Sequence, residues 1–185
     1  MSRKKEKNIY LFGAGASVAA GLPPQARLLN HIYTIEKPDK IALADFMNTF
    51  DNIFSVLLIN RFPYFEKSRR VLSDFIIKSF GSQSLRSYFY ALFASYNAKS
   101  IFNYKESNQE INHKWKTIFL RIRDINVSLE DLFTLLDKAQ ILKEYFSTYS
   151  IQEISNIQEK LNYCIVYSIS FSMQVAKNNP LYQQI

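Results

Sequence analysis

Residues 9–23, IYLFGAGASVAAGLP, dominate the fold prediction because they hold three of the chain's four glycines directly after an apolar run. The run over residues 9–12 is typical of a buried strand. A tight turn at Gly13 would bring the backbone close to a phosphate, since Gly15 has no Cβ to keep the anion away. Residues 16–20 suit a short helix whose unpaired N–H groups would face the same anion. The stretch therefore predicts a nucleotide-phosphate loop.

The spacing of these glycines differs from the common dinucleotide-binding fingerprint. That fingerprint, G-x-G-x-x-G, requires a glycine at position 18, where the chain has Val18. Glycine returns instead at Gly21 and is followed by Leu22 and Pro23. A coincidental glycine-rich turn in another α/β nucleotide fold is the alternative explanation of this pattern.

The resulting pattern, G-A-G-A-S-x-x-x-G-L-P over residues 13–23, resembles the first motif of the sirtuin family. With the pair Leu28 and Leu29 behind it, the segment is more similar to the sirtuin-like NADase domains of bacterial anti-phage defence proteins, which hydrolyse NAD+. The resemblance implies a Rossmann-like α/β fold and NAD+ or an ADP-ribose-type nucleotide as substrate or ligand. The residues that it assigns to nucleotide binding are Gly13, Ala14, Gly15, Ala16, Ser17, Gly21 and Pro23.

The chain departs from the sirtuin pattern directly after this motif. Sirtuin deacylases continue with an acidic residue, an aromatic residue and an arginine, whereas residues 24–27 are PQAR. Arg27 lies one position later than the family arginine, and a solvent-exposed place on a helix over residues 25–33 explains it equally well. The four-cysteine zinc module of the deacylases is also absent, because Cys164 is the only cysteine. We expect Cys164 to be a buried thiol and the chain to bind no zinc.

The composition predicts one globular domain in the cytoplasm. Of the 185 residues, 48% are apolar and 21% charged, which is an ordinary globular balance. The charged N-terminus lacks the apolar core of a secretion signal, and no stretch approaches the roughly 18 apolar residues of a membrane span. We divide residues 1–185 into a strand, phosphate loop and first helix over 1–35 and a helical insertion over 36–185.

The net charge of +7 raises the question of nucleic-acid binding. Much of the excess lies in a short basic segment at the N-terminus, residues 3–7, and the remainder is spread along the chain. Such a segment is typical of a solvated tail, and the aromatic residues fall at helical spacing rather than in a pattern for stacking bases. We therefore expect no nucleic-acid partner, and leave a homo-oligomer open.

Beyond Pro38 the sequence predicts helices almost exclusively. Apolar residues recur at threes and fours from Ile41 to Leu58, as on one face of a helix. Further helices are predicted over residues 65–80, 83–98, 112–123, 129–146 and 151–176. Only the strand over residues 9–12 is clear, so the fold class rests on a Rossmann-like N-terminal portion with a large helical remainder.

Two serine–acid pairs have the spacing of helix N-terminal capping boxes: Ser128 with Asp131, and Ser150 with Glu153. The segment SLEDLFTLL, which begins at Ser128, also resembles an acidic helix of sirtuin-like defence proteins. Glu130 could therefore serve the nucleotide site. The helix dipole alone also favours an acidic residue in a first turn.

The catalytic residues that the sirtuin-like resemblance implies have no clear match in this chain. Sirtuin-like catalysis uses an asparagine in a T-x-N segment and a histidine beyond it. The nearest candidates are Asn103, which precedes the acidic helix, and His113, which lacks the glycine that follows the family histidine. We expect both at the surface, with the catalytic residues in a downstream segment or a partner protein. The chain is thus predicted to be the N-terminal part of an NAD+ hydrolase; a catalytically inactive nucleotide-sensing module and a helical protein-interaction domain are the alternatives.

Overall fold

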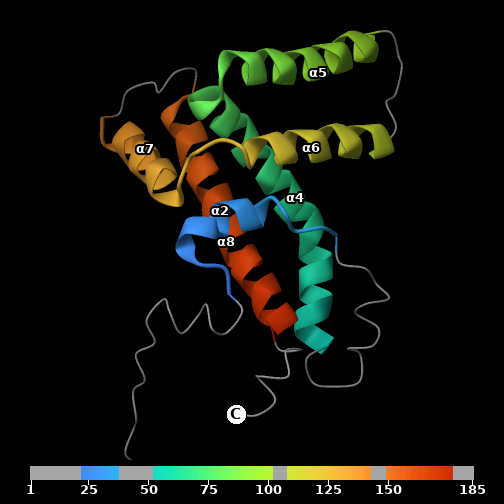
Figure 1. Cartoon of the computed structure of the whole chain (residues 1–185), viewed down its shortest axis with the longest axis vertical. Coiled ribbons are helices and arrows are strands. Elements are labelled where there is room, and N and C mark those ends of the chain that lie inside the picture. Colours follow the sequence, from blue (N-terminus) through green and yellow to red (C-terminus); the bar gives the residue numbers. More distant parts are fainter. Residues whose placement is uncertain (1–21, 38–51, 102–107, 143–148, 177–185) are drawn as a thin grey trace, which may run out of the picture.

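The structure is a computed structural model, and it describes residues 22–37, 52–101, 108–142 and 149–176. Most of the residues in these ranges lie in helices (Figure 1). The helices are α2 (Gln25–Ile32), α4 (Asn52–Phe80), α5 (Gln83–Ile101), α6 (Asn108–Ile122), α7 (Leu129–Leu142) and α8 (Ile151–Ala176).

The α/β prediction is wrong, because the described part of the chain is an all-helical fold without a strand or sheet. That prediction rested on the strand over residues 9–12, which lies outside the described residues. One strand cannot form a sheet, since its backbone N–H and C=O groups need a partner strand. The sequence beyond residue 38 offers helical periodicity, and the structure follows it. The predicted helices that begin at residues 25, 83, 129 and 151 begin at those residues.

The two longest helices, α4 and α8, form the centre of the fold. They lie side by side in Figure 1. α2 crosses α8, and α7 packs beside α8. The pair is antiparallel, because Leu58 of α4 lies against Tyr167 of α8 whereas Asp74 lies against Tyr149, just before α8. α5 and α6 pack against α4 and against each other, and they extend to one side of the central pair.

α4 continues through Pro63, where the sequence predicted two separate helices. Proline removes one backbone donor from a helix, which weakens the turn before it. Tyr167 of α8 donates a hydrogen bond to the carbonyl of Leu58 at 3.0 Å, and Tyr163 donates to that of Arg61 at 3.4 Å. The preceding turn is thus bonded to α8, and the proline ring is exposed. Two tyrosines of α8 therefore hold the stretch of α4 that precedes Pro63.

The buried side chains form two clusters. The larger one lies among α2, α4, α5, α6, α7 and α8, and its fully buried members include Leu72, Phe75, Ile118, Leu132 and Leu161. The second cluster includes Phe65 and Tyr167, whose rings stack at 4.2 Å between centroids, and also Cys164. Cys164 is fully buried, which confirms the predicted buried thiol. Burial raises its pKa to about 12, so the thiol is unreactive at neutral pH.

Both predicted capping boxes are present. In the first, the Asp131 amide donates to Ser128 Oγ at 3.1 Å, and the Ser128 amide donates to the Asp131 carboxylate at 2.9 Å. The second is formed in the same way by Ser150 and Glu153, at 3.3 and 2.7 Å. These reciprocal bonds satisfy backbone donors that a helix leaves open at its start, so they fix where α7 and α8 begin.

Candidate functional site

The predicted nucleotide residues fall almost entirely outside the described ranges. This holds for Gly13, Ala14, Gly15, Ala16, Ser17 and Gly21. Pro23 is half-buried and leads through Pro24 directly into α2. Pro24 has an extended backbone, and its carbonyl accepts a hydrogen bond from the Arg27 amide at 2.8 Å. The last residues of the motif are therefore continuous with α2.

α2 is anchored by the leucine pair that contributes to the sirtuin-like resemblance. Leu28 and Leu29 are buried in the larger cluster, and Ile32 is buried in the second. Arg27 is exposed on the outer face of α2, as predicted by the alternative interpretation of Arg27 as a solvent-exposed helix residue. The end of the motif is thus held at a defined place on the helical body.

The acidic helix lies next to this point. Glu130, in the first turn of α7, accepts a hydrogen bond from Nε2 of Gln25, the first residue of α2, at 3.2 Å. Both side chains are exposed. The structure therefore brings together the start of α2 and the start of α7, which are more than a hundred residues apart in the sequence.

Of the two candidate catalytic residues, only His113 lies in the described part of the chain. Asn103 lies outside the described ranges. His113 is exposed on α6, as expected, and its backbone carbonyl accepts a hydrogen bond from the Thr117 hydroxyl at 3.1 Å. Nothing in the surroundings of His113 distinguishes it from an ordinary surface histidine.

His31 of α2 instead contacts Ser172 of α8, with Nε2 and Oγ separated by 2.7 Å. The Ser172 hydroxyl donates to the Ser168 carbonyl at 3.0 Å, so Nε2 of His31 is the donor to Ser172. Partial burial lowers the pKa of His31 and favours its neutral form. Because the serine proton is directed at a carbonyl, the pair links two helices and does not activate a nucleophile.

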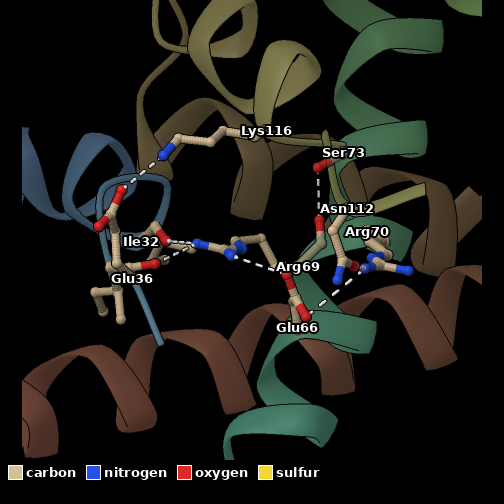
Figure 2. Close-up of polar contacts among 9 residues, drawn as sticks. Ile32, Glu36, Glu66, Arg69, Arg70, Ser73, Asn112 and Lys116 are labelled. Atoms are coloured by element: carbon tan, nitrogen blue, oxygen red, sulfur yellow. Dashed lines mark hydrogen bonds and ion pairs between the residues drawn. The ribbon is translucent and has the colours of Figure 1, made fainter. Parts of the chain in front are cut away.

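A pocket of about 520 Å³ lies where residues 33–37 meet α4 and α6. Figure 2 shows part of its lining: Arg69 of α4 reaches toward Ile32, and Lys116 of α6 reaches toward Glu36. The pocket is lined by Tyr33, Thr34, Ile35, Glu36, Lys37, Phe62, Glu66, Arg69, Asn112, Lys116, Phe119, Leu120 and Arg123.

Arg69 is the buried cation of this pocket, with 4% of its surface exposed. Its Nη1 donates to the carbonyls of Ile32 at 3.2 Å and Ile35 at 2.8 Å, which are at and just beyond the end of α2. The guanidinium carbon lies 4.1 Å from the centre of the Phe119 ring. Nη2 is 3.6 Å from a carboxylate oxygen of Glu66. Burial lowers the pKa of Arg69, but an arginine stays charged at any physiological pH.

The remaining charges give the pocket a positive balance. Four cationic and two anionic side chains line it. Lys116 pairs with Glu36 at 3.0 Å, and Glu66 is shared between Arg69 and Arg70, each at 3.6 Å. Lys37 and Arg123 are exposed and have no ion-pair partner among the described residues.

Sequence reasoning missed this pocket. The only local pattern in the sequence at this pocket is the spacing of Glu66, Arg69 and Arg70, which predicts ion pairs within one helix. It gives no indication that Arg69 reaches the carbonyls of Ile32 and Ile35, more than thirty residues earlier.

Within the described ranges, no group of three or more histidine, cysteine, aspartate and glutamate side chains is arranged to hold a metal ion. None of the described helices combines the length and apolar character needed to span a membrane. Comparison of the chain with protein-family models, curated proteins and solved structures finds no match. The functional argument therefore depends on the residues of this chain.

Proposed function

We propose that the chain binds NAD+ or an ADP-ribose-type nucleotide through residues 13–23. In this proposal it is the N-terminal part of an NAD+ hydrolase similar to the sirtuin-like enzymes of bacterial anti-phage defence. The observation that carries the proposal is the motif GAGASVAAGLP itself. In such a motif the glycines would let a phosphate approach the backbone closely, and Ser17 would add a hydroxyl at the same place.

The arrangement around α2 supports the proposal in two ways. The motif runs without interruption into α2, which Leu28 and Leu29 anchor in the larger cluster. The acidic helix, which the same resemblance connects with sirtuin-like defence proteins, contacts the first residue of α2 through Glu130. The start of the acidic helix therefore lies next to the first turn of α2, two residues after the motif.

The proposed chemistry separates binding from cleavage. Backbone N–H groups of the loop would hold the pyrophosphate, which is remote from the bond that joins nicotinamide to ribose. Cleavage of that bond requires stabilisation of an oxocarbenium-like centre and a positioned water. Because Asn103 and His113 do not match the family positions, we propose that residues 1–185 bind the nucleotide without hydrolysing it.

Substitution of Gly15 tests the binding site. Gly15→Val places a branched side chain where the phosphate oxygens must approach, so we expect it to abolish binding of NAD+ and ADP-ribose in calorimetric titrations. Ala94→Val, on an exposed position of α5, is the matched control and should bind like the wild type. Equal affinities of wild type and Gly15→Val, with both folded by circular dichroism, would refute the proposed loop.

Nicotinamide release tests the separation of binding from cleavage. We expect release by residues 1–185 to stay near the background rate, because a positioned general base commonly contributes about 10²- to 10⁴-fold. Robust turnover would contradict this expectation. Asn103→Ala and His113→Ala would then show whether these two residues carry the activity.

A further inference from the structure

We infer that the pocket among residues 33–37, α4 and α6 is a binding site for a small organic phosphate. The inference rests on the described side chains and does not depend on the glycine loop. It would be a second anion site on the chain, on the side of α2 where the helix ends.

Arg69 forms the floor of this site. Two carbonyl acceptors and the Phe119 ring hold its guanidinium in one orientation. Its Nε is buried and has no hydrogen-bond partner within the part of the chain that the structure describes. A buried N–H without an acceptor is unfavourable, and buried polar groups in folded proteins nearly always have a partner. The Arg69 guanidinium places a fixed positive charge at the floor of the pocket, and an anionic ligand in the pocket would balance this charge.

Two lining cations have no ion-pair partner in the described ranges, and they favour phosphate over a single carboxylate. Lys37 and Arg123 line the pocket and are exposed to solvent. Lys116 is already paired with Glu36. A phosphate monoester carries between one and two negative charges at neutral pH, and these would balance the net charge of +2 on the lining.

The remaining lining residues suit the organic part of such a ligand. Phe62, Phe119 and Leu120 provide apolar contacts, and Leu120 is unusually exposed for a leucine, at 52%. Asn112 adds an amide that can donate or accept. The volume of about 520 Å³ lies in the range of small-molecule sites, about 300–1,000 Å³. A phosphate attached to a small ring or sugar would fit this space.

Titration with phenyl phosphate, followed by amide resonances of the 15N-labelled chain, tests the inference. We expect saturable shifts concentrated in residues 33–37 and in α6. Inorganic phosphate should produce the same shifts at lower affinity, because it lacks the apolar part. Phenol, which lacks the phosphate, should not bind. The absence of saturable shifts at up to about 10 mM phenyl phosphate would overturn the inference.

Charge reversal at the rim identifies the residues responsible. We expect Lys37→Glu combined with Arg123→Glu to weaken phenyl phosphate at least about tenfold, since two charge-assisted contacts are lost. Lys67→Glu combined with Lys138→Glu changes the net charge equally at exposed positions outside the pocket and should leave the affinity unchanged. An equal loss in both double variants would overturn the site. Gly15→Val should bind phenyl phosphate normally, so failure of the glycine-loop proposal and failure of this one are distinguishable.

Discussion

α2 and α7 both pack against α8, but they are held in place by different kinds of contact. α7 begins at a capping box formed by Ser128 and Asp131, three residues apart. α2 begins at Pro24 with no side-chain cap and no acidic residue in its first turn. The carbonyls at its other end accept hydrogen bonds from Arg69 of α4. The start of α7 is therefore specified locally, whereas α2, which follows the nucleotide motif, depends on a distant helix.

Removal of the Arg69 side chain should have the largest effect on stability. Arg69→Leu leaves the carbonyls of Ile32 and Ile35 without their donor, and each unsatisfied buried group costs about 1–3 kcal/mol. We expect the free energy of unfolding to fall by about 3 kcal/mol or more, measured by urea denaturation. Arg123→Leu, on the exposed rim of the same pocket, should change it by less than about 0.5 kcal/mol. Similar losses in the two variants would show that Arg69 does not hold α2.

The contrast between the two helices also explains what the sequence could predict. The starts of α7 and α8 depend on serine–acid pairs and apolar periodicity within the same segment, so both were predicted correctly. The stretch of α4 before Pro63 is bonded to tyrosines of α8, and the pocket depends on Arg69 reaching the end of α2. Such contacts join segments far apart in the chain, and no local pattern indicates them. The α/β fold class was wrong because a single predicted strand was given more weight than the helices that follow it.

Loss of the local cap on α7 should have a moderate effect. Ser128→Ala removes the hydroxyl that accepts from the Asp131 amide, and N-cap serines contribute about 1 kcal/mol. We expect a loss of that size in urea denaturation. Hydrogen exchange should become faster in the first turn of α7 and stay unchanged in α2. Equally faster hydrogen exchange in α7 and α2 would contradict the view that the start of α7 is specified locally.

The acid response of α7 should be the smallest effect. Hydrogen bonds from the Ser128 amide and hydroxyl lower the pKa of Asp131 below its usual 3.8. The contribution of this carboxylate to stability is therefore complete above its pKa in the unfolded chain and is lost as the pH falls through its lower pKa in the folded chain. Asp131→Asn should flatten the decline of unfolding free energy below pH 5 relative to the wild type. A decline of the same steepness in both proteins would exclude this contribution.

The central claim is that the glycine-rich segment ahead of α2 binds an ADP-ribose-type nucleotide. The most direct measurement is a titration of the 15N-labelled wild-type chain with ADP-ribose, following the amide resonances of residues 13–23 and of the first turn of α2. We expect saturable shifts centred on Gly13, Gly15 and Ser17. A folded chain whose resonances in this segment do not respond to ADP-ribose would contradict it.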